Sequence, residues 1–73
     1  MAPPLISGRE CIKTLGRMGY VWIRTRGSHA VLRHQDGRTT VVPLHSRETI
    51  GPGLLRAILR DVEMSVENFQ KLC

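Results

Sequence analysis

Two hydrophobic periodicities alternate along the chain, and the first is helical. Apolar side chains recur every three or four residues between Ser7 and Gly19, which predicts an amphipathic helix over this segment. Ser7 and Glu10 have the spacing of a capping box, and Gly19 is a typical helix stop. The apolar face of this helix consists of Cys11, Leu15 and Met18, with Ile12 beside it.

The second periodicity is that of strands. Segments rich in β-branched and aromatic residues predict strands at 20–25, 29–34 and 38–44. Residues 26–28 form a turn between the first two, and Asp36-Gly37 is the favoured dipeptide of a tight hairpin. Three strands joined by two short turns form an antiparallel meander.

Helical spacing returns after the third strand and a loop. Pro52 suits the first turn of a helix, and Ser65 can cap a last short one. The apolar positions are Leu55, Ile58, Leu59 and Val62, followed by Val66, Phe69 and Leu72. We therefore expect a single α+β domain over residues 1–73, with a lead-in at 1–6 and a helical tail at 65–73. Its elements are a three-stranded antiparallel sheet and helices packed on one face of it, in the order α-β-β-β-α.

The strand pattern leaves apolar residues on both faces of this sheet. Alternation puts Tyr20 and Trp22 on one face of the first strand and Val21 and Ile23 on the other. Two helices cover one face, so some apolar side chains remain on the open one. They indicate either a protein partner or dimer contact, or short strands whose edge residues are half-exposed.

Charge is unevenly distributed along the chain. Eleven basic side chains face six acidic ones, for a formal net charge of +5. Residues 1–60 contain ten of the basic and three of the acidic groups, whereas residues 61–73 have a net charge of −2. A basic body of this kind is more than a solvated face and indicates an anionic partner, either nucleic acid or an acidic protein.

The composition argues against several other classes. No apolar run approaches the roughly 18 residues of a membrane span, and the N-terminus has no signal-peptide pattern. We therefore expect no membrane association and a cytoplasmic protein in which Cys11 and Cys73 are reduced. No paired-cysteine motif and no histidines spaced along a helix are present, so we expect no metal and no cofactor.

The sequence contains three histidines, and His29 has the most suggestive neighbours. It follows the turn residues Gly27 and Ser28, with Arg24 and Arg26 just upstream. Gly27 would allow the backbone to approach a substrate closely, and Ser28 offers a hydroxyl or amide donor.

The other two histidines lie near strand ends. His34, beside the second turn, is interpreted as a solvated residue. Antiparallel pairing around a turn at 35–37 places residue 29 opposite residue 43, so His29 and His45 are expected at one end of the sheet.

A histidine among arginines suits metal-free cleavage of RNA. That reaction removes the 2′-hydroxyl proton, protonates the leaving 5′-oxygen and stabilises a charged phosphorane. Histidine, with a reference pKa of about 6.5, can take either proton-transfer role, and arginine can hold phosphate in a bidentate fork. His29 is one candidate for this proton transfer, although a Gly-Ser-His tripeptide alone is a weak signal. The residues expected to contact RNA are Arg24, Arg26, Gly27, Ser28, Arg38, His45 and Arg47.

From Leu5 to Phe69 the sequence resembles the HicA (YcfA-like) toxin family, small mRNA interferases of type II toxin–antitoxin pairs. The resemblance rests on the order and spacing of Ser7-Gly8-Arg9-Glu10, Leu15 with Gly19, Arg26-Gly27-Ser28-His29, Pro43-Leu44-His45, Pro52-Gly53 and the Leu55/Ile58/Leu59 face. It implies a double-stranded-RNA-binding-domain-like fold and a catalytic histidine at His29. It also implies a HicB antitoxin as partner, which neutralises the toxin by covering the active site. The family's second motif histidine falls on His45.

Two functions remain open at this point. The first is a toxin that acts as a metal-independent endoribonuclease on mRNA and inhibits translation. The alternative is a non-catalytic RNA-binding module of the same fold. Replacement of His29 by Ala separates them, because only the first function requires its proton transfer.

Overall fold

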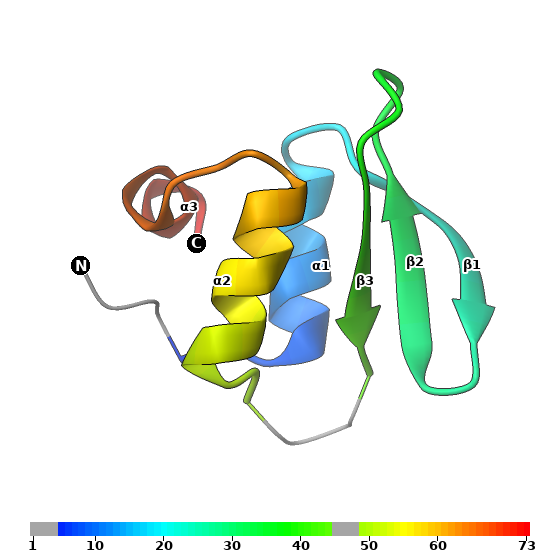
Figure 1. Cartoon of the computed structure of the whole chain (residues 1–73), viewed down its shortest axis with the longest axis horizontal. Helices are drawn as coiled ribbons and strands as arrows, with labels where there is room; N and C mark the ends of the chain where they lie inside the picture. Colours follow the sequence, from blue (N-terminus) through cyan, green and yellow to red (C-terminus); the bar gives the residue numbers. More distant parts are fainter. Residues whose placement is uncertain (1–4, 45–48) are drawn as a thin grey trace.

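The computed structural model describes residues 5–44 and 49–73, and its elements follow the predicted order (Figure 1). They are α1 (Gly8–Gly16), β1 (Val21–Arg26), β2 (His29–Arg33), β3 (Thr39–Pro43), α2 (Pro52–Asp61) and α3 (Val66–Leu72). The α+β class and the α-β-β-β-α order are therefore confirmed. The likeness to a double-stranded-RNA-binding domain stays a prediction.

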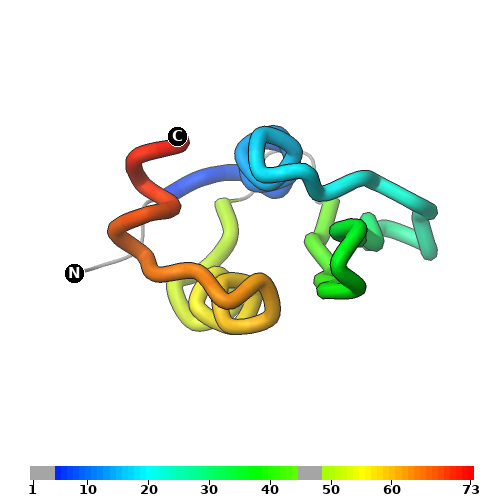
Figure 2. Tube along the Cα trace, turned by 90° about the horizontal axis from the view of Figure 1, so that it is seen from above, coloured from blue at the N-terminus to red at the C-terminus, as the bar shows by residue number. Residues whose placement is uncertain are grey.

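The strands form one antiparallel sheet in the order β1-β2-β3, and the helices lie together on one side of it (Figure 2). The core lies between these two layers. Its main members are Cys11, Leu15, Tyr20, Leu32, Val42, Leu55, Ile58, Leu59, Val62 and Phe69. The other face of the sheet carries no helix within the described ranges, and no helix there is long and apolar enough to cross a membrane.

The boundaries of several elements differ from the prediction. The capping box is present, with N–O distances of 3.1 and 3.2 Å between Ser7 and Glu10, but α1 ends at Gly16 rather than Gly19. A turn follows, and Gly19 has a φ of +95°, a left-handed conformation that glycine adopts without strain. Tyr20 is buried and precedes β1 instead of belonging to it.

Each of the three strands differs from its predicted bounds by one residue at one or both ends. β1 begins and ends one residue later than predicted, β2 ends one residue earlier, and β3 loses one residue at each end. The predicted pairings of the meander survive these changes, because both hairpins keep their turns.

A β-bulge in β1 changes which side chains share a face. The register with β2 shifts between Trp22 and Arg24, so Ile23 is an extra residue. Trp22 Nε1 donates a hydrogen bond to Thr25 Oγ1 at 2.8 Å, although residues three apart on a regular strand point to opposite faces. The prediction that side chains of the first strand alternate regularly between the two faces of the sheet is therefore wrong beyond Ile23. The bulge places Arg24 on the open face, opposite Val31.

Candidate nucleic-acid interface

The candidate site is built on the turn between β1 and β2. Gly27 and Ser28 form the turn, and Gly27 has a φ of +59°. Ser28 has no positive φ, and this combination is typical of a type II′ hairpin turn with glycine first. A Cβ placed on Gly27 would meet no atom within 4 Å, so glycine serves the backbone conformation here, not a shortage of space.

The turn presents His29 at the start of β2. His29 pairs with Arg26 across the hairpin and with Pro43 on β3, which confirms the predicted pairing of residues 29 and 43. The Leu44 amide donates to the Ser28 carbonyl oxygen at 2.6 Å and ties the end of β3 to the turn. His29 is exposed, and its side chain makes no hydrogen bond to another described residue. His45 and Arg47, the other candidates expected near this end, lie outside the described residues.

Arg24, Arg26 and His29 share the open face of the sheet. Arg24 pairs with Val31, which alternates with the core residue Leu32, and Arg26 pairs directly with His29. The structure thus brings together three of the residues selected from the sequence. Without the bulge at Ile23, regular alternation would have put both arginines on the face toward the helices.

One further arginine on this face was missed at the sequence level. Arg33 ends β2 and lies four residues from His29, an even spacing that puts both on the same side of the strand. The signal was present in that spacing. It was overlooked because Arg33 belongs to none of the short motifs around the turns.

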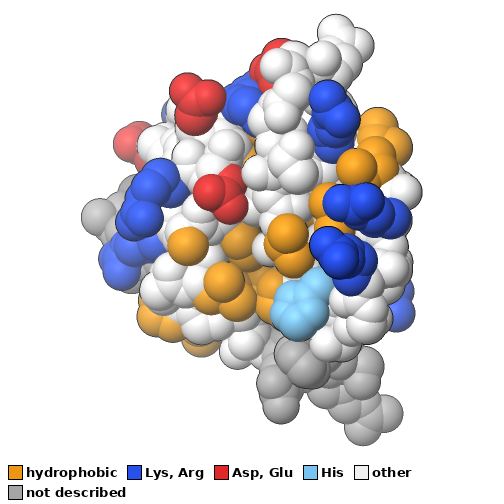
Figure 3. All heavy atoms as spheres, turned by 45° about the vertical axis from the view of Figure 1, so that its right-hand side comes forward, with side chains coloured by type: hydrophobic (Ala, Val, Ile, Leu, Met, Phe, Trp, Pro, Cys, Tyr) orange, Lys and Arg blue, Asp and Glu red, His pale blue; other side chains and the backbone are white. Residues whose placement is uncertain are grey.

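The open face is strongly positive. β1, β2 and β3 contain Arg24, Arg26 and Arg33 and no Asp or Glu. Within the described ranges none of these arginines has a salt bridge. Figure 3 shows Lys and Arg side chains following hydrophobic ones down this side of the molecule, with a histidine beside them, while acidic side chains lie away from it. Unpaired arginines without neighbouring acids attract phosphate.

Arg38 lies at the opposite end of the sheet from His29. It precedes β3, whereas His29 pairs with the last residue of that strand, a separation of about 16 Å at 3.3 Å per residue. Its guanidinium contacts Asp36 at 2.8 Å, donates to the Val62 carbonyl oxygen at 2.6 Å and lies 5.7 Å from the centre of the Tyr20 ring. The structure does not bring Arg38 together with the residues around His29.

His34 is not the solvated residue that its position beside a turn predicted. Its side chain is 19% exposed, and its ring centre lies 5.2 Å from that of Tyr20. Nδ1 accepts from the Asp36 amide at 3.2 Å and lies 3.1 Å from Asp36 Oδ2. The reason is local: the turn folds Asp36 back onto the ring, and Arg38 holds that carboxylate in place.

Other kinds of site find little support. Among residues 5–44 and 49–73, no three His, Cys, Asp or Glu side chains cluster in a way that could hold a metal ion. Burial raises the pKa of the Cys11 thiol to about 12, with a smaller contribution from Cys73, so Cys11 stays protonated and unreactive at neutral pH. The two strands joined by the Gly27-Ser28 turn contain no acid that would orient a catalytic triad.

The groups on this face have the chemistry to act on a phosphodiester. An exposed imidazole can exchange a proton with substrate or water, and two arginines on the same face can hold the phosphate beside it. The backbone of the hairpin is fixed by sheet pairing on both sides of His29.

Comparison with known families gives one finding. The family model described as the HicA toxin of bacterial toxin–antitoxin systems matches residues 8–64, which is more than half of the chain. The matched range includes α1, the whole sheet and α2. No curated protein matches the chain.

Proposed function

The chain belongs to the HicA toxin family of bacterial toxin–antitoxin systems, and from that premise we propose that it is a metal-independent endoribonuclease. Its substrate is mRNA, its effect is inhibition of translation, and its catalytic residue is His29. Its compartment is the cytoplasm, where mRNA is translated.

The observation that carries this proposal is the pairing of Arg26 with His29 on an exposed strand end. An imidazole that reaches solvent and has no hydrogen bond to a described side chain can meet an RNA backbone directly. Arg24 and Arg26 lie on the same face, and the three strands contain no carboxylate that would compete with phosphate for them.

The proposed reaction is transesterification within the RNA. The 2′-oxygen attacks the adjacent phosphorus, the bond from phosphorus to the 5′-oxygen breaks, and a 2′,3′-cyclic phosphate and a 5′-hydroxyl result. The proton of the 2′-hydroxyl leaves as the bond forms, and the 5′-oxygen gains a proton as it departs. His29 acts as general acid/base in this exchange, and Arg24 and Arg26 stabilise the charge on the phosphorane. His45 and Arg47, which the sequence predicts near the same strand end, remain candidate RNA contacts.

The proposed protein partner is a HicB-like antitoxin. A partner that covers the open face neutralises the positive charge of Arg24, Arg26 and Arg33 and also covers apolar residues. Val21, Ile23 and Val41 are 60%, 48% and 44% exposed. Residues of this kind amid cations favour a partner with both apolar and acidic side chains.

Cleavage of a defined RNA in EDTA tests the catalytic proposal. We expect the wild type to cut the RNA, His29→Ala to be inactive, and Arg60→Ala, which removes an exposed arginine from α2, to cut it at the wild-type rate. The products should carry cyclic phosphates. Full activity of His29→Ala would show that His29 is not the catalytic residue. Products ending in 5′-phosphates would contradict the transesterification mechanism. A wild type that binds the RNA without cutting it would favour the non-catalytic RNA-binding module.

A further inference from the structure

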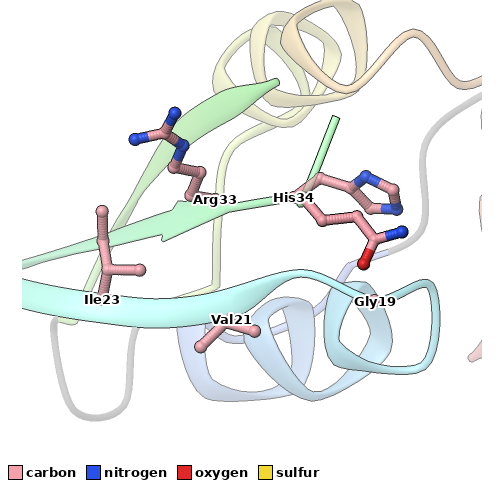
Figure 4. Close-up of a pocket in the computed structure, with 6 residues that line it drawn as sticks. Gly19, Val21, Ile23, Arg33 and His34 are labelled. Atoms are coloured by element: carbon pink, nitrogen blue, oxygen red, sulfur yellow. The ribbon is translucent and has the colours of Figure 1, made fainter. Parts of the chain in front are cut away.

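A pocket lies on the sheet, at the end away from His29. It has a volume of about 270 Å³ and is lined by Gly19, Val21, Ile23, Arg33, His34 and Gln35. Figure 4 shows that these residues come from the start of β1, the end of β2 and the segments next to them. Val21 pairs with Arg33 across the two strands, which places these two lining residues on the same face of the sheet as His29.

One wall of this pocket is held in place by a chain of contacts. The His34 ring is fixed by Tyr20 on one side and by Asp36 at Nδ1. Asp36 is bound by Arg38 at 2.8 Å, and Arg38 in turn donates to the Val62 carbonyl oxygen at the end of α2. The position of His34 is therefore linked to the helical layer and does not depend on a ligand.

Gly19 makes room for that ring. A Cβ at this position would lie 3.2 Å from His34 Nε2, and the backbone there has a φ of +95°. Any other residue would strain the backbone and crowd the imidazole. The missing side chain at Gly19 thus leaves room for the Nε2 edge of His34 beside the pocket.

The lining has the chemistry that recognises an unstacked nucleobase. Val21 and Ile23 supply apolar surface, and the Arg33 guanidinium and the His34 imidazole are planar groups on which bases stack. The Gln35 amide both donates and accepts, as the edge of a base requires. The volume is slightly below the usual range of small-molecule pockets, which suits one base better than a larger ligand.

We propose that this pocket binds one base of single-stranded RNA and contributes to the choice of cleavage site. The inference rests on the proposed function, because it assigns a subsite to the same substrate. Arg33 lies four residues from His29 on β2, about 13 Å along the strand. The bound base therefore belongs to a different nucleotide from the one at which the RNA is cut. The RNA runs along the positive open face between the two ends of the sheet.

Binding measured without cleavage tests the pocket independently of catalysis. In the His29→Ala protein, we titrate short single-stranded oligoribonucleotides that differ at one base and follow amide and side-chain NH signals by NMR. The expected result is a shift of the Gly19, Arg33 and Gln35 signals for a preferred base. Arg33→Ala or Gln35→Ala should weaken binding of the preferred oligonucleotide roughly tenfold and remove the preference. Gln35 is an exposed turn residue, so its variant keeps the fold, and Arg60→Ala on α2 is the matched control.

The outcomes separate this proposal from the function on which it rests. If Gln35→Ala and Arg33→Ala bind every oligonucleotide as the parent does, the pocket is no base subsite, whatever the cleavage assay shows. If the pocket signals move on adding antitoxin and stay unchanged with RNA, the site is a protein contact and the base proposal is wrong. If the signals move with RNA while the wild-type protein cleaves no RNA, the base-binding site is supported and the proposed nuclease activity is wrong.

Discussion

The two ends of the sheet each carry a histidine, and the two side chains differ in their exposure and contacts. His29 begins β2 at an exposed hairpin and has no side-chain hydrogen bond within the described residues. His34 follows β2 at the other end and is held by Tyr20, Asp36 and, through Asp36, Arg38. One imidazole is presented to solvent, and the other is part of the protein's own packing.

This difference shows that residue type alone does not assign chemistry. A proton carrier must reach its substrate, whereas a recognition surface must keep its shape before the ligand arrives. The end with His29 meets the first requirement through a tight turn and sheet pairing. The end with His34 meets the second through contacts that reach α2.

Replacing each of the two histidines by alanine should affect different properties: His29→Ala the cleavage rate, and His34→Ala the stability. The loss of cleavage is the largest effect we expect. His29→Ala should lower the cleavage rate by about 10² to 10⁴, the usual contribution of general acid–base catalysis. It should leave the free energy of unfolding within about 0.5 kcal/mol of wild type, because the side chain is exposed. His34→Ala should lower that free energy by about 1 kcal/mol, because it loses a ring contact and a hydrogen bond.

Single-turnover cleavage and urea unfolding of both variants measure these quantities. A His29→Ala protein that is destabilised by 2 kcal/mol would show that His29 has a structural role. The comparison between the two ends would then fail.

The turn that presents His29 is the next most sensitive point. Gly27→Ala places a side chain at a φ of +59°, which costs about 1–2 kcal/mol in the left-handed region. We expect lower stability and slower cleavage, since relief of the strain moves His29 relative to Arg26. Unfolding and single-turnover cleavage are measured together.

Gly16→Ala is the matched control for this substitution. It also adds a Cβ that meets nothing within 4 Å, but it lies at the helical end of α1 without a positive φ. It should change the free energy of unfolding by no more than about 0.5 kcal/mol and leave cleavage unchanged. If both glycine variants behave alike, the turn conformation is not what positions His29.

Salt dependence separates the arginines of the two ends. Loss of one phosphate contact lowers the slope of log affinity against log salt by about 0.7 for single-stranded nucleic acid. We expect this change for Arg24→Gln at the His29 end. For Arg38→Gln the slope should stay the same while the urea midpoint falls, because that guanidinium is bound to Asp36 and to the Val62 carbonyl oxygen. A reduced slope for Arg38→Gln would return it to the RNA contacts that the sequence predicted.

Much of the fold could be predicted from local sequence signals. The capping box at Ser7, the turn glycines and the two hydrophobic periodicities each fix a short segment, so the element order was correct. The bulge at Ile23 could not be predicted, because it depends on how β1 pairs with β2 and on the hydrogen bond from Trp22 to Thr25.

The residues of the candidate site could be predicted only in part from the sequence, for the same reason. Arg24 and Arg26 were selected because they are near His29 in sequence, and Arg38 was selected only for its charge. Its actual partners lie on the hairpin turn and at the end of α2, a contact across 24 positions that no local pattern contains. Arg33 was missed although its even spacing from His29 placed it on the same face.

Acid titration gives the smallest expected effect and tests the anchoring of the His34 end. Hydrogen bonds from Arg38 lower the pKa of the Asp36 carboxyl from 3.8 to about 2. A carboxyl with a lowered pKa in the folded state stabilises the fold above its unfolded pKa, and this contribution is lost as the pH falls through the folded one. The difference in urea midpoint between wild type and Asp36→Asn should thus be constant at neutral pH, shrink below about pH 4 and be lost as the pH falls through about 2. Subtracting the variant removes the titration of the other five acids, which both proteins share. A difference that persists unchanged to pH 2 would mean that the Asp36 carboxylate does not hold Arg38. The chain of contacts from α2 to His34 would then lose its middle link.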